Sequence, residues 1–247
     1  PGATPVHTPV ATRPAQVLTI NQTENADRQL RAWQARKSRH FEFARESMEK
    51  LERQLAKGKG AKEQADGTAL FDDDTRARFV PKGDESAASS RAAYLVDRWL
   101  ELDVYPAAVP AKWKNQDGYW IVQMVGLSPP LENDKLSEHL ILLDYLMGHP
   151  DRRSGPDSWG VVGKDRRSVA LTARAGFLEL AATPVQDAAR IVVSDVRLSG
   201  LYEQAQDSSL LQSLQNLLSA EQLEWMRKRL TQLRDRVKIL SELTRSS

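Results

Sequence analysis

The chain of 247 residues contains no cysteine, which excludes disulfide bonds, a thiolate nucleophile and a metal site with cysteine ligands. Its four histidines, at positions 7, 40, 139 and 149, lack the H-x-x-x-H and H-E-x-x-H spacings of zinc-binding helices. No apolar run approaches the roughly 18 residues that a membrane-spanning helix needs. We therefore expect neither a metal site of these kinds nor a transmembrane segment.

An excess of charge of one sign is also missing. The 35 lysines and arginines nearly balance the 33 aspartates and glutamates, so the formal net charge is only +2. A charge this small gives no bulk attraction to nucleic acid or to an anionic membrane, and we expect no nucleic-acid partner. With 40% hydrophobic and 28% charged residues, the composition is that of an ordinary soluble globular protein.

The N-terminal quarter of the chain has a composition of its own. Residues 1–22 contain four prolines among threonine, valine and alanine, which predicts an extended tether. Residues 23–57 predict a long amphipathic helix, and residues 58–67, with glycine and charged side chains, predict a flexible linker. The helix has one apolar stripe with spacings of three and four: Phe41, Ala44, Met48, Leu51 and Leu55.

This stripe has two interpretations. It either docks the helix on the main domain or binds another protein through residues 23–55, and the tether is a second docking element for such a partner. Because the chain begins at Pro1 rather than at methionine and continues as a tether, we expect a periplasmic or secreted location.

Residues 68–247 predict a mixed α+β domain. Extended segments are predicted near the end of 69–82 and over 104–113, 118–125, 159–162 and 168–172, the last two as a hairpin. Helices are predicted over 91–102, over 133–147 and through the C-terminal region. Ser89 or Ser90 is the expected cap of the first helix, and Ser219 with Gln222 forms a capping box for the last.

Three segments resemble, in order and spacing, the atypical kinases, a group that includes secretory-pathway protein kinases, spore-coat-type bacterial kinases and phosphatidylinositol-kinase-like enzymes. Residues 91–106, RAAYLVDRWLELDVYP, are similar to the helix that carries the ion-pair glutamate in that group. Residues 142–159, LLDYLMGHPDRRSGPDSW, resemble its catalytic loop, D-Y-L-x-G-N-x-D-R-H-x-x-N. Residues 217–236 resemble the helix that closes the bacterial relatives.

The resemblance implies a two-lobed kinase-like domain with a mostly helical C-lobe and an added long N-terminal helix. The small lobe would span about 68–127 and the helical lobe about 128–247. By position, Asp151 matches the aspartate that orients the acceptor hydroxyl. Lys82, in the run Phe79-Val-Pro-Lys82, matches the lysine that steadies the phosphates of the nucleotide.

Other parts of the kinase site are replaced in this sequence. Pro156 stands where the metal-binding asparagine is expected, and Thr172 or Ala173 stands where the metal-binding aspartate is expected. The ion-pair glutamate falls at Ser90 or Arg91. Asp157 is a candidate substitute ligand for nucleotide-bound metal. The basic Arg153 and Arg174 beside the missing ligands suggest a second hypothesis, in which ion pairs to Asp151 or Asp157 hold this region shut.

Loss of both metal ligands removes the means of offsetting the charge of a triphosphate. We therefore expect a pseudokinase that acts as a scaffold or allosteric partner, not an enzyme, with no metal and no cofactor. Two alternatives stay open. The first is a divergent ATP- and magnesium-dependent phosphotransferase with Asp151 as the base. The second is a helical interaction or regulatory protein with a fortuitous resemblance, in which Lys82 is a surface lysine; a helix in place of the strand at 119–125 would favour it.

Overall fold

The computed structural model describes residues 49–58, 61–72, 74–124, 126–150, 152, 159–162, 166–171 and 176–245. The chain splits into two compact units, Pro1–Leu51 and Glu52–Ser247, and all the strands and the helices α2 to α7 belong to the second unit. The expected tether, and the expected helix up to residue 48, lie outside the described residues, whereas residues 49–57 are helical.

Five antiparallel strands form the main sheet, with the order β1-β2-β3-β5-β4. Their bounds are β1 Lys62–Glu63, β2 Thr68–Leu70, β3 Arg76–Pro81, β4 Ala108–Trp113 and β5 Gln116–Val122. The buried indole of Trp120, at the centre of β5, has edge-to-face contacts with the rings of Phe71, Phe79 and Trp113, at centroid distances of 5.3, 5.1 and 5.1 Å. Such pairs stabilise a core beyond their area of burial, so this aromatic cluster holds the sheet together.

The first strand corrects the prediction of a flexible linker over residues 58–67. In β1, Lys62 pairs with Leu70 and Glu63 with Ala69. The turn between β1 and β2 is closed by Asp66, whose carboxylate accepts hydrogen bonds from the backbone N–H and the hydroxyl of Thr68. Gly67 follows with a φ of 77°. An Asp-Gly pair between two short strands is a hairpin signal, and it explains why this segment belongs to the sheet.

Helix α2 (Glu85–Trp99) links the sheet to the rest of the unit. It begins six residues before the predicted start at Arg91, because Asp84 caps it by accepting a hydrogen bond of 2.8 Å from the backbone N–H of Ser86. Aspartate caps helices as well as serine does. Ser90 therefore lies inside the helix, where it is buried, and the expectation that Ser89 or Ser90 caps the helix was wrong.

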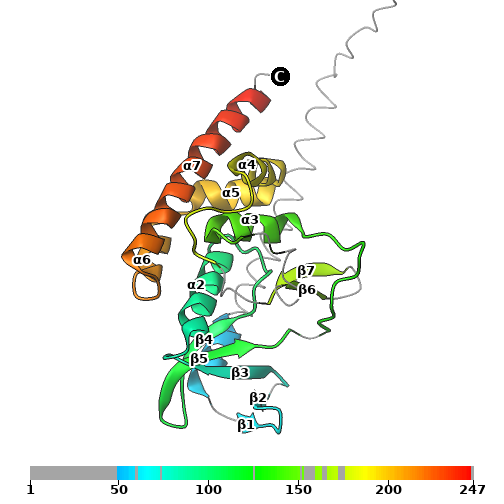
Figure 1. Ribbon diagram of the computed structural model, residues 1–247, viewed down its shortest axis with the longest axis vertical. Helices are drawn as coiled ribbons and strands as arrows, with labels where there is room; N and C mark the ends of the chain where they lie inside the picture. Colours follow the sequence, from blue (N-terminus) through cyan, green and yellow to red (C-terminus); the bar gives the residue numbers. More distant parts are fainter. Residues whose placement is uncertain are drawn as a thin grey trace, which may run out of the picture. The chain divides into compact units, whose positions relative to one another are not determined.

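The rest of the unit is mostly helical, as predicted. It contains α3 (Glu138–Met147), α4 (Val185–Ser194), α5 (Val196–Gln204), α6 (Asp207–Leu214) and α7 (Ala220–Arg245). Figure 1 shows α3, α4 and α5 on the opposite side of α2 from the five-stranded sheet, with α7 running along this helical group. The predicted capping box of the last helix is confirmed by hydrogen bonds of 3.0 and 3.2 Å between Ser219 and Gln222.

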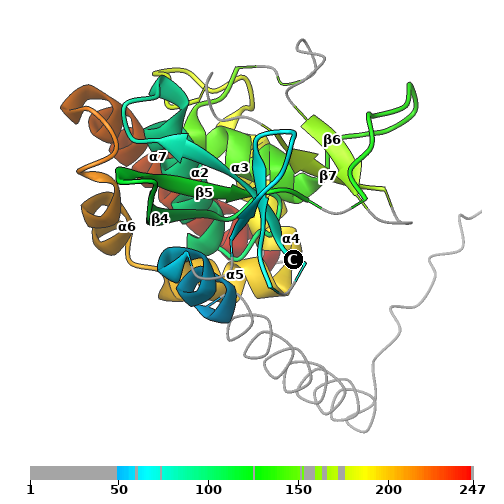
Figure 2. The ribbon, with the colours of Figure 1, turned by 90° about the horizontal axis from the view of Figure 1, so that it is seen from below.

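A two-stranded hairpin, β6 (Trp159–Val162) with β7 (Arg167–Ala170), confirms the predicted strand pair. Figures 1 and 2 both show it as a separate ribbon outside the five-stranded sheet, and β7 contacts α3. The strand at 116–122 is also present, so the helix that would have favoured a helical interaction protein is not found there. An antiparallel sheet followed by a mostly helical part is consistent with the predicted two-lobed kinase-like fold. In the part of the chain that the structure describes, no helix is both long and apolar enough to cross a bilayer.

The connection from α2 to β4 depends on one buried carboxylate. Asp97 is 2% exposed, and its Oδ1 accepts hydrogen bonds from the backbone N–H groups of Val104, at 2.9 Å, and Tyr105, at 3.1 Å. Burial raises the pKa of Asp97 to about 7, against the two amide donors, which lower it. Ionised Asp97 is therefore costly in the folded protein.

This cost predicts a pH dependence of stability. In the unfolded chain the carboxyl ionises near its ordinary pKa of 3.8, and in the folded chain near 7. Below pH ~4 the carboxyl is neutral in both states, and the folded protein has its full stability. As the pH rises to ~7, the free energy of unfolding falls, because the unfolded chain loses this proton more easily than the folded chain. Asp97→Asn keeps an acceptor for both amides without the charge. We expect the free energy of unfolding of Asp97→Asn to exceed that of the wild type by up to about 4 kcal/mol at pH ~8, and the gap to close by pH ~4.

Denaturant titrations of both proteins across this pH range measure the gap in the free energy of unfolding. Subtracting one free energy from the other removes the contribution of the other titrating groups, which both proteins share. Asp97→Ala is the matched control, because it leaves the two amides without an acceptor and should destabilise the protein by about 2 kcal/mol or more. A gap between wild type and Asp97→Asn that does not change with pH would contradict the assignment.

Candidate functional site

A buried ion pair frames the loop that resembles the kinase catalytic loop. Arg152 Nε lies 3.0 Å from each carboxylate oxygen of Asp144 in α3, and Arg152 Nη2 lies 2.6 Å from Oδ1. The Arg152 side chain is fully buried and that of Asp144 is 7% exposed. A guanidinium that binds a carboxylate through two of its nitrogens fixes direction as well as distance. The pair therefore fixes Arg152 against α3, whereas Asp151, the residue before it, lies outside the described residues.

Gly148 lets the chain leave α3 and enter this loop. It has the left-handed conformation, with φ 64° and ψ 40°, and its N–H donates to the carbonyls of Asp144 and Tyr145. A β-carbon at this position would lie 2.6 Å from Arg229 Nη1 and still closer to the carbonyl oxygen of Leu178. Only glycine fits both the conformation and the space.

Arg229, from the last helix, binds the backbone on both sides of the loop. Its Nε donates to the carbonyl of Leu146 at 3.1 Å, and its Nη1 donates to the carbonyls of Leu178, at 2.6 Å, and Glu179, at 3.1 Å. Burial lowers the pKa of Arg229 to about 10, which leaves it charged at neutral pH. A cation is stabilised at the C-terminal end of α3 because the last carbonyls of a helix carry partial negative charge.

His149 contacts the backbone of its own loop. Its Nδ1 lies 2.5 Å from the carbonyl oxygen of Pro150 and donates to it. Its Nε2 is buried without a hydrogen-bond partner among the described residues. Burial, followed by the positive charge of Arg152, lowers the pKa of His149. The neutral imidazole thus lies beside the Asp144–Arg152 pair, at the edge of a pocket of about 370 Å³ next to α4.

A second pocket, of about 430 Å³, lies between the sheet and the end of the β6–β7 hairpin. We call it the cleft pocket. Its described lining is one arginine, one glutamine and six apolar residues: Arg78, Pro106, Ile121, Val122, Gln123, Met124, Leu127 and Leu171. Leu127 and Leu171 are 43% and 37% exposed. Apolar walls with few polar groups are typical of small-molecule sites, and Arg78 is the one cation among the described lining residues.

Arg78 lies within β3, whereas Lys82 lies just beyond its end. Arg78 pairs with Ile121, and Pro81, the last residue of the strand, pairs with Gly118. Lys82 follows Pro81 in a turn and is exposed. At about 3.3 Å per residue of strand, the backbone of Pro81 lies about 10 Å from that of Arg78. Arg78 is thus the cation of the cleft pocket, and Lys82 is not among its described lining residues.

The other predicted site residues lie outside the described residues. Asp151 and Asp157 are among them, as are Pro156 and the positions 172–174 of the missing metal-binding aspartate and of Arg174. Arg153 is outside as well, so the structure does not test its pairing with either aspartate. Arg152, next to Asp151, pairs with Asp144 across eight residues. In the parts of the chain that are described, no group of three or more histidine and carboxylate side chains is placed to hold a metal ion.

Comparisons with known proteins give a likeness to solved structures alone. No family model matches the chain, and no curated protein matches it. Among solved structures, the chain is similar to the Helicobacter pylori proinflammatory kinase CtkA, with a TM-score of 0.39 and 12% sequence identity. That alignment covers 68% of this chain and 86% of the other.

Proposed function

We propose that this protein is a pseudokinase, a scaffold or allosteric partner built on a kinase-like fold, that does not transfer phosphate. One observation carries the proposal: Pro156 stands where the kinases have the metal-binding asparagine, and Thr172 or Ala173 stands where they have the metal-binding aspartate, so the groups that would hold the metal ions of the nucleotide are missing from the sequence. The position of Lys82, exposed in the turn after β3 and outside the described lining of the cleft pocket, gives further support.

The partner under this proposal is another protein, bound through the helix of residues 23–55 or through the tether. The support is the apolar stripe before Leu51, in which Phe41, Ala44 and Met48 recur at spacings of three and four residues along an otherwise charged segment. Leu55, the last member of the stripe, is buried in the core instead. A periplasmic or secreted location is part of the same proposal. Neither metal nor cofactor is required for such a role, since binding alone biases the partner between its conformations.

Calorimetric titration with ATP, with and without magnesium, tests the loss of phosphoryl transfer. We expect no saturable magnesium-dependent binding below about 1 mM ATP, because one carboxylate cannot replace two metal ligands. Arg78→Ala and Lys82→Ala form the matched pair. Any metal-free binding should weaken in Arg78→Ala and remain unchanged in Lys82→Ala.

Magnesium-dependent binding that is lost in Asp151→Ala or Asp157→Ala would overturn the pseudokinase proposal and favour the divergent phosphotransferase. The scaffold role has its own readout. Met48→Asp places a charge on the apolar stripe, so it should abolish capture of the partner and leave the melting temperature of the protein within about 2 °C of the wild type. Capture that survives this change would exclude the helix as the binding element.

A further inference from the structure

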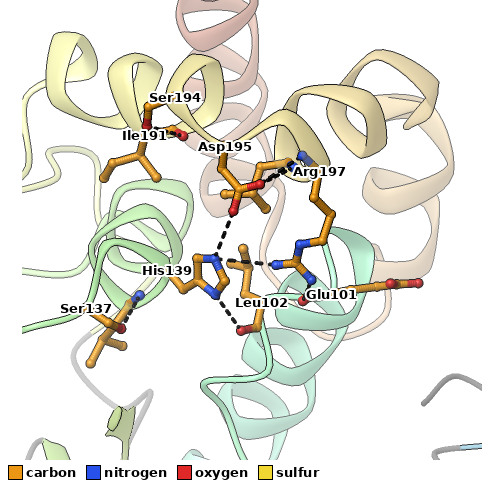
Figure 3. Close-up of polar contacts among 10 residues, drawn as sticks. Glu101, Leu102, Ser137, His139, Ile191, Ser194, Asp195 and Arg197 are labelled. Carbon is orange, nitrogen blue, oxygen red and sulfur yellow. Dashed lines mark hydrogen bonds and ion pairs between the residues drawn. The ribbon is translucent and has the colours of Figure 1, made fainter. Parts of the chain in front are cut away.

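A pocket of about 370 Å³ lies beside α4, and we call it the α4 pocket. Residues at the start of α3, in the loop after α3 and in α4 line it, and none of its described lining residues belongs to the cleft pocket. Figure 3 shows the first turn of α3, where Ser137 caps the helix, close to α4, where Ile191 is one of the lining residues. Elements that are distant in the sequence thus enclose one space.

Contacts within the protein hold the walls of the α4 pocket in place. The N–H of Ala182, in the segment before α4, donates to the carbonyl of His149 at 3.2 Å. Arg152, in the same loop as His149, is fixed against α3 by its ion pair with Asp144. Helix α4 itself packs against both α3 and α7. A pocket whose walls are already fixed loses little free energy to ordering when a molecule binds, so the α4 pocket is suited to a small ligand.

A group of apolar side chains lines the α4 pocket: Leu136, Ile141, Pro150, Ala182, Pro184 and Ile191. Pockets that bind drug-sized molecules have volumes of roughly 300–1,000 Å³, and a dry cavity of about 150 Å³ holds a benzene molecule. With a volume of about 370 Å³, the α4 pocket has room for a molecule of one or two rings. Burial of such a molecule among these side chains removes apolar surface from water, which favours binding.

The inner end of the α4 pocket carries a hydrogen-bond acceptor that no described residue satisfies. The buried polar members of the lining are Asp144, His149 and Arg152, and the first and last of these bind each other. His149 Nδ1 donates to the carbonyl of Pro150, so the neutral ring has its lone pair on Nε2. This nitrogen is buried and has no hydrogen-bond partner among the described residues. An acceptor in this state raises the free energy of the folded protein, and a donor brought to the inner end would offset that cost.

The charged residues of the α4 pocket disfavour an anion. The described lining has three carboxylates and two guanidinium groups: Glu138, Asp144, Asp187, Arg152 and Arg190. Asp144 pairs with Arg152, and Asp187 lies 3.6 Å from Arg190, which leaves Glu138 without an ion pair among the described residues. His149 adds no positive charge, because burial, followed by the charge of Arg152, lowers its pKa. The balance of charge therefore favours a molecule that is neutral or positively charged.

We propose that the α4 pocket binds a small apolar molecule without negative charge, whose N–H or O–H group donates to His149 Nε2. The apolar body of the ligand lies among Ile141, Pro184 and Ile191, and its donor lies at the inner end of the pocket. Bound there, the ligand contacts α4 and the loop after α3 together, so it stabilises the segment that contains His149 and Arg152. This site goes beyond the proposed pseudokinase role, because it needs neither the cleft pocket nor the N-terminal helix.

Indole and 1-methylindole are matched probes for this site, because they have nearly the same shape but only indole has an N–H to donate. In titrations of the full chain followed by nuclear magnetic resonance, we expect indole to bind with a Kd below ~1 mM. 1-Methylindole should bind about tenfold more weakly, since it leaves Nε2 without a partner. The ¹⁵N resonance of His149 Nε2 should move with indole and stay in place with 1-methylindole. Indole-3-carboxylate, the anionic probe, should also bind about tenfold more weakly than indole.

Two exposed lining residues distinguish the α4 pocket from the cleft pocket. Ala182→Trp fills the α4 pocket from its rim and should abolish indole binding, whereas Leu171→Trp fills the cleft pocket and should leave indole binding unchanged. Binding that survives Ala182→Trp would overturn the proposal. Equal affinities of indole and 1-methylindole for the wild type, or indole binding that does not saturate in the millimolar range, would overturn it as well. These measurements involve neither ATP nor a protein partner, so the α4 pocket and the pseudokinase proposal fail separately.

Discussion

Gly148→Ala is expected to destabilise the protein by about 4 kcal/mol, enough to unfold most of a marginally stable domain. The added β-carbon would overlap the carbonyl of Leu178 and the guanidinium of Arg229. Arg229 cannot move away without breaking its hydrogen bonds to three carbonyls, and one of these is the carbonyl of Leu178 itself. Strain from the left-handed backbone adds about 1 kcal/mol. Chemical denaturation monitored by circular dichroism measures the loss.

Gly67→Ala is the matched control for this change. Gly67 also has a positive φ, of 77°, but nothing lies within 4 Å of its missing β-carbon. Gly67→Ala should therefore lose only the free energy of the backbone strain, about 1 kcal/mol. Equal losses in the two variants would show that Arg229 and Leu178 do not lie as close to Gly148 as described.

Arg152→Met is expected to cost about 3–5 kcal/mol, because it leaves the carboxylate of Asp144 buried without its cation. Asp144→Asn should lose a similar amount, since the fully buried guanidinium then lacks its counter-charge. The double replacement by apolar residues, Asp144→Leu with Arg152→Met, should recover part of this loss because no uncompensated charge remains. The free energy of unfolding of all three variants, measured at one pH, tests this order.

An exposed pair provides the comparison for this ion pair. Arg227 and Glu224, on α7, are 60% and 49% exposed at their side chains, and Arg227→Met should change stability by less than about 0.5 kcal/mol. A loss in Arg152→Met as small as that in Arg227→Met would mean that the Asp144–Arg152 contact is open to solvent. A double variant less stable than either single variant would show that packing, and not charge, dominates at this site.

Elements encoded by local patterns were predicted well from the sequence. The strand at 118–125, the hairpin near 159–172 and the capping box at Ser219 and Gln222 depend on residues close together in the chain, and the structure contains all three. The start of α2 was missed because Asp84 and Ser90 are equally good caps by type. Which one acts depends on where the helix packs, and that is not a local property.

The site was harder to predict because its members are brought together by distant pairings. Arg78 reaches the cleft pocket through the register of β3 on β5, and Leu171, directly after β7 and some ninety residues further on, belongs to the same lining. Lys82 was predicted because the run Phe79-Val-Pro-Lys82 resembles a kinase motif, and Arg78 was not considered. No local pattern indicates that Arg229, in the last helix, binds the end of α3.

The contact between Leu146 and Arg229 joins residues 83 positions apart, and this separation has a consequence for synthesis. A ribosome adds roughly 5–20 residues each second, so the segment around Gly148 emerges several seconds before the arginine that completes its surroundings. During that interval the carbonyls of Leu146 and Leu178 have only water as a partner. A nascent chain stalled before residue 229 should therefore be more readily cut by protease near Gly148 than a chain released after α7.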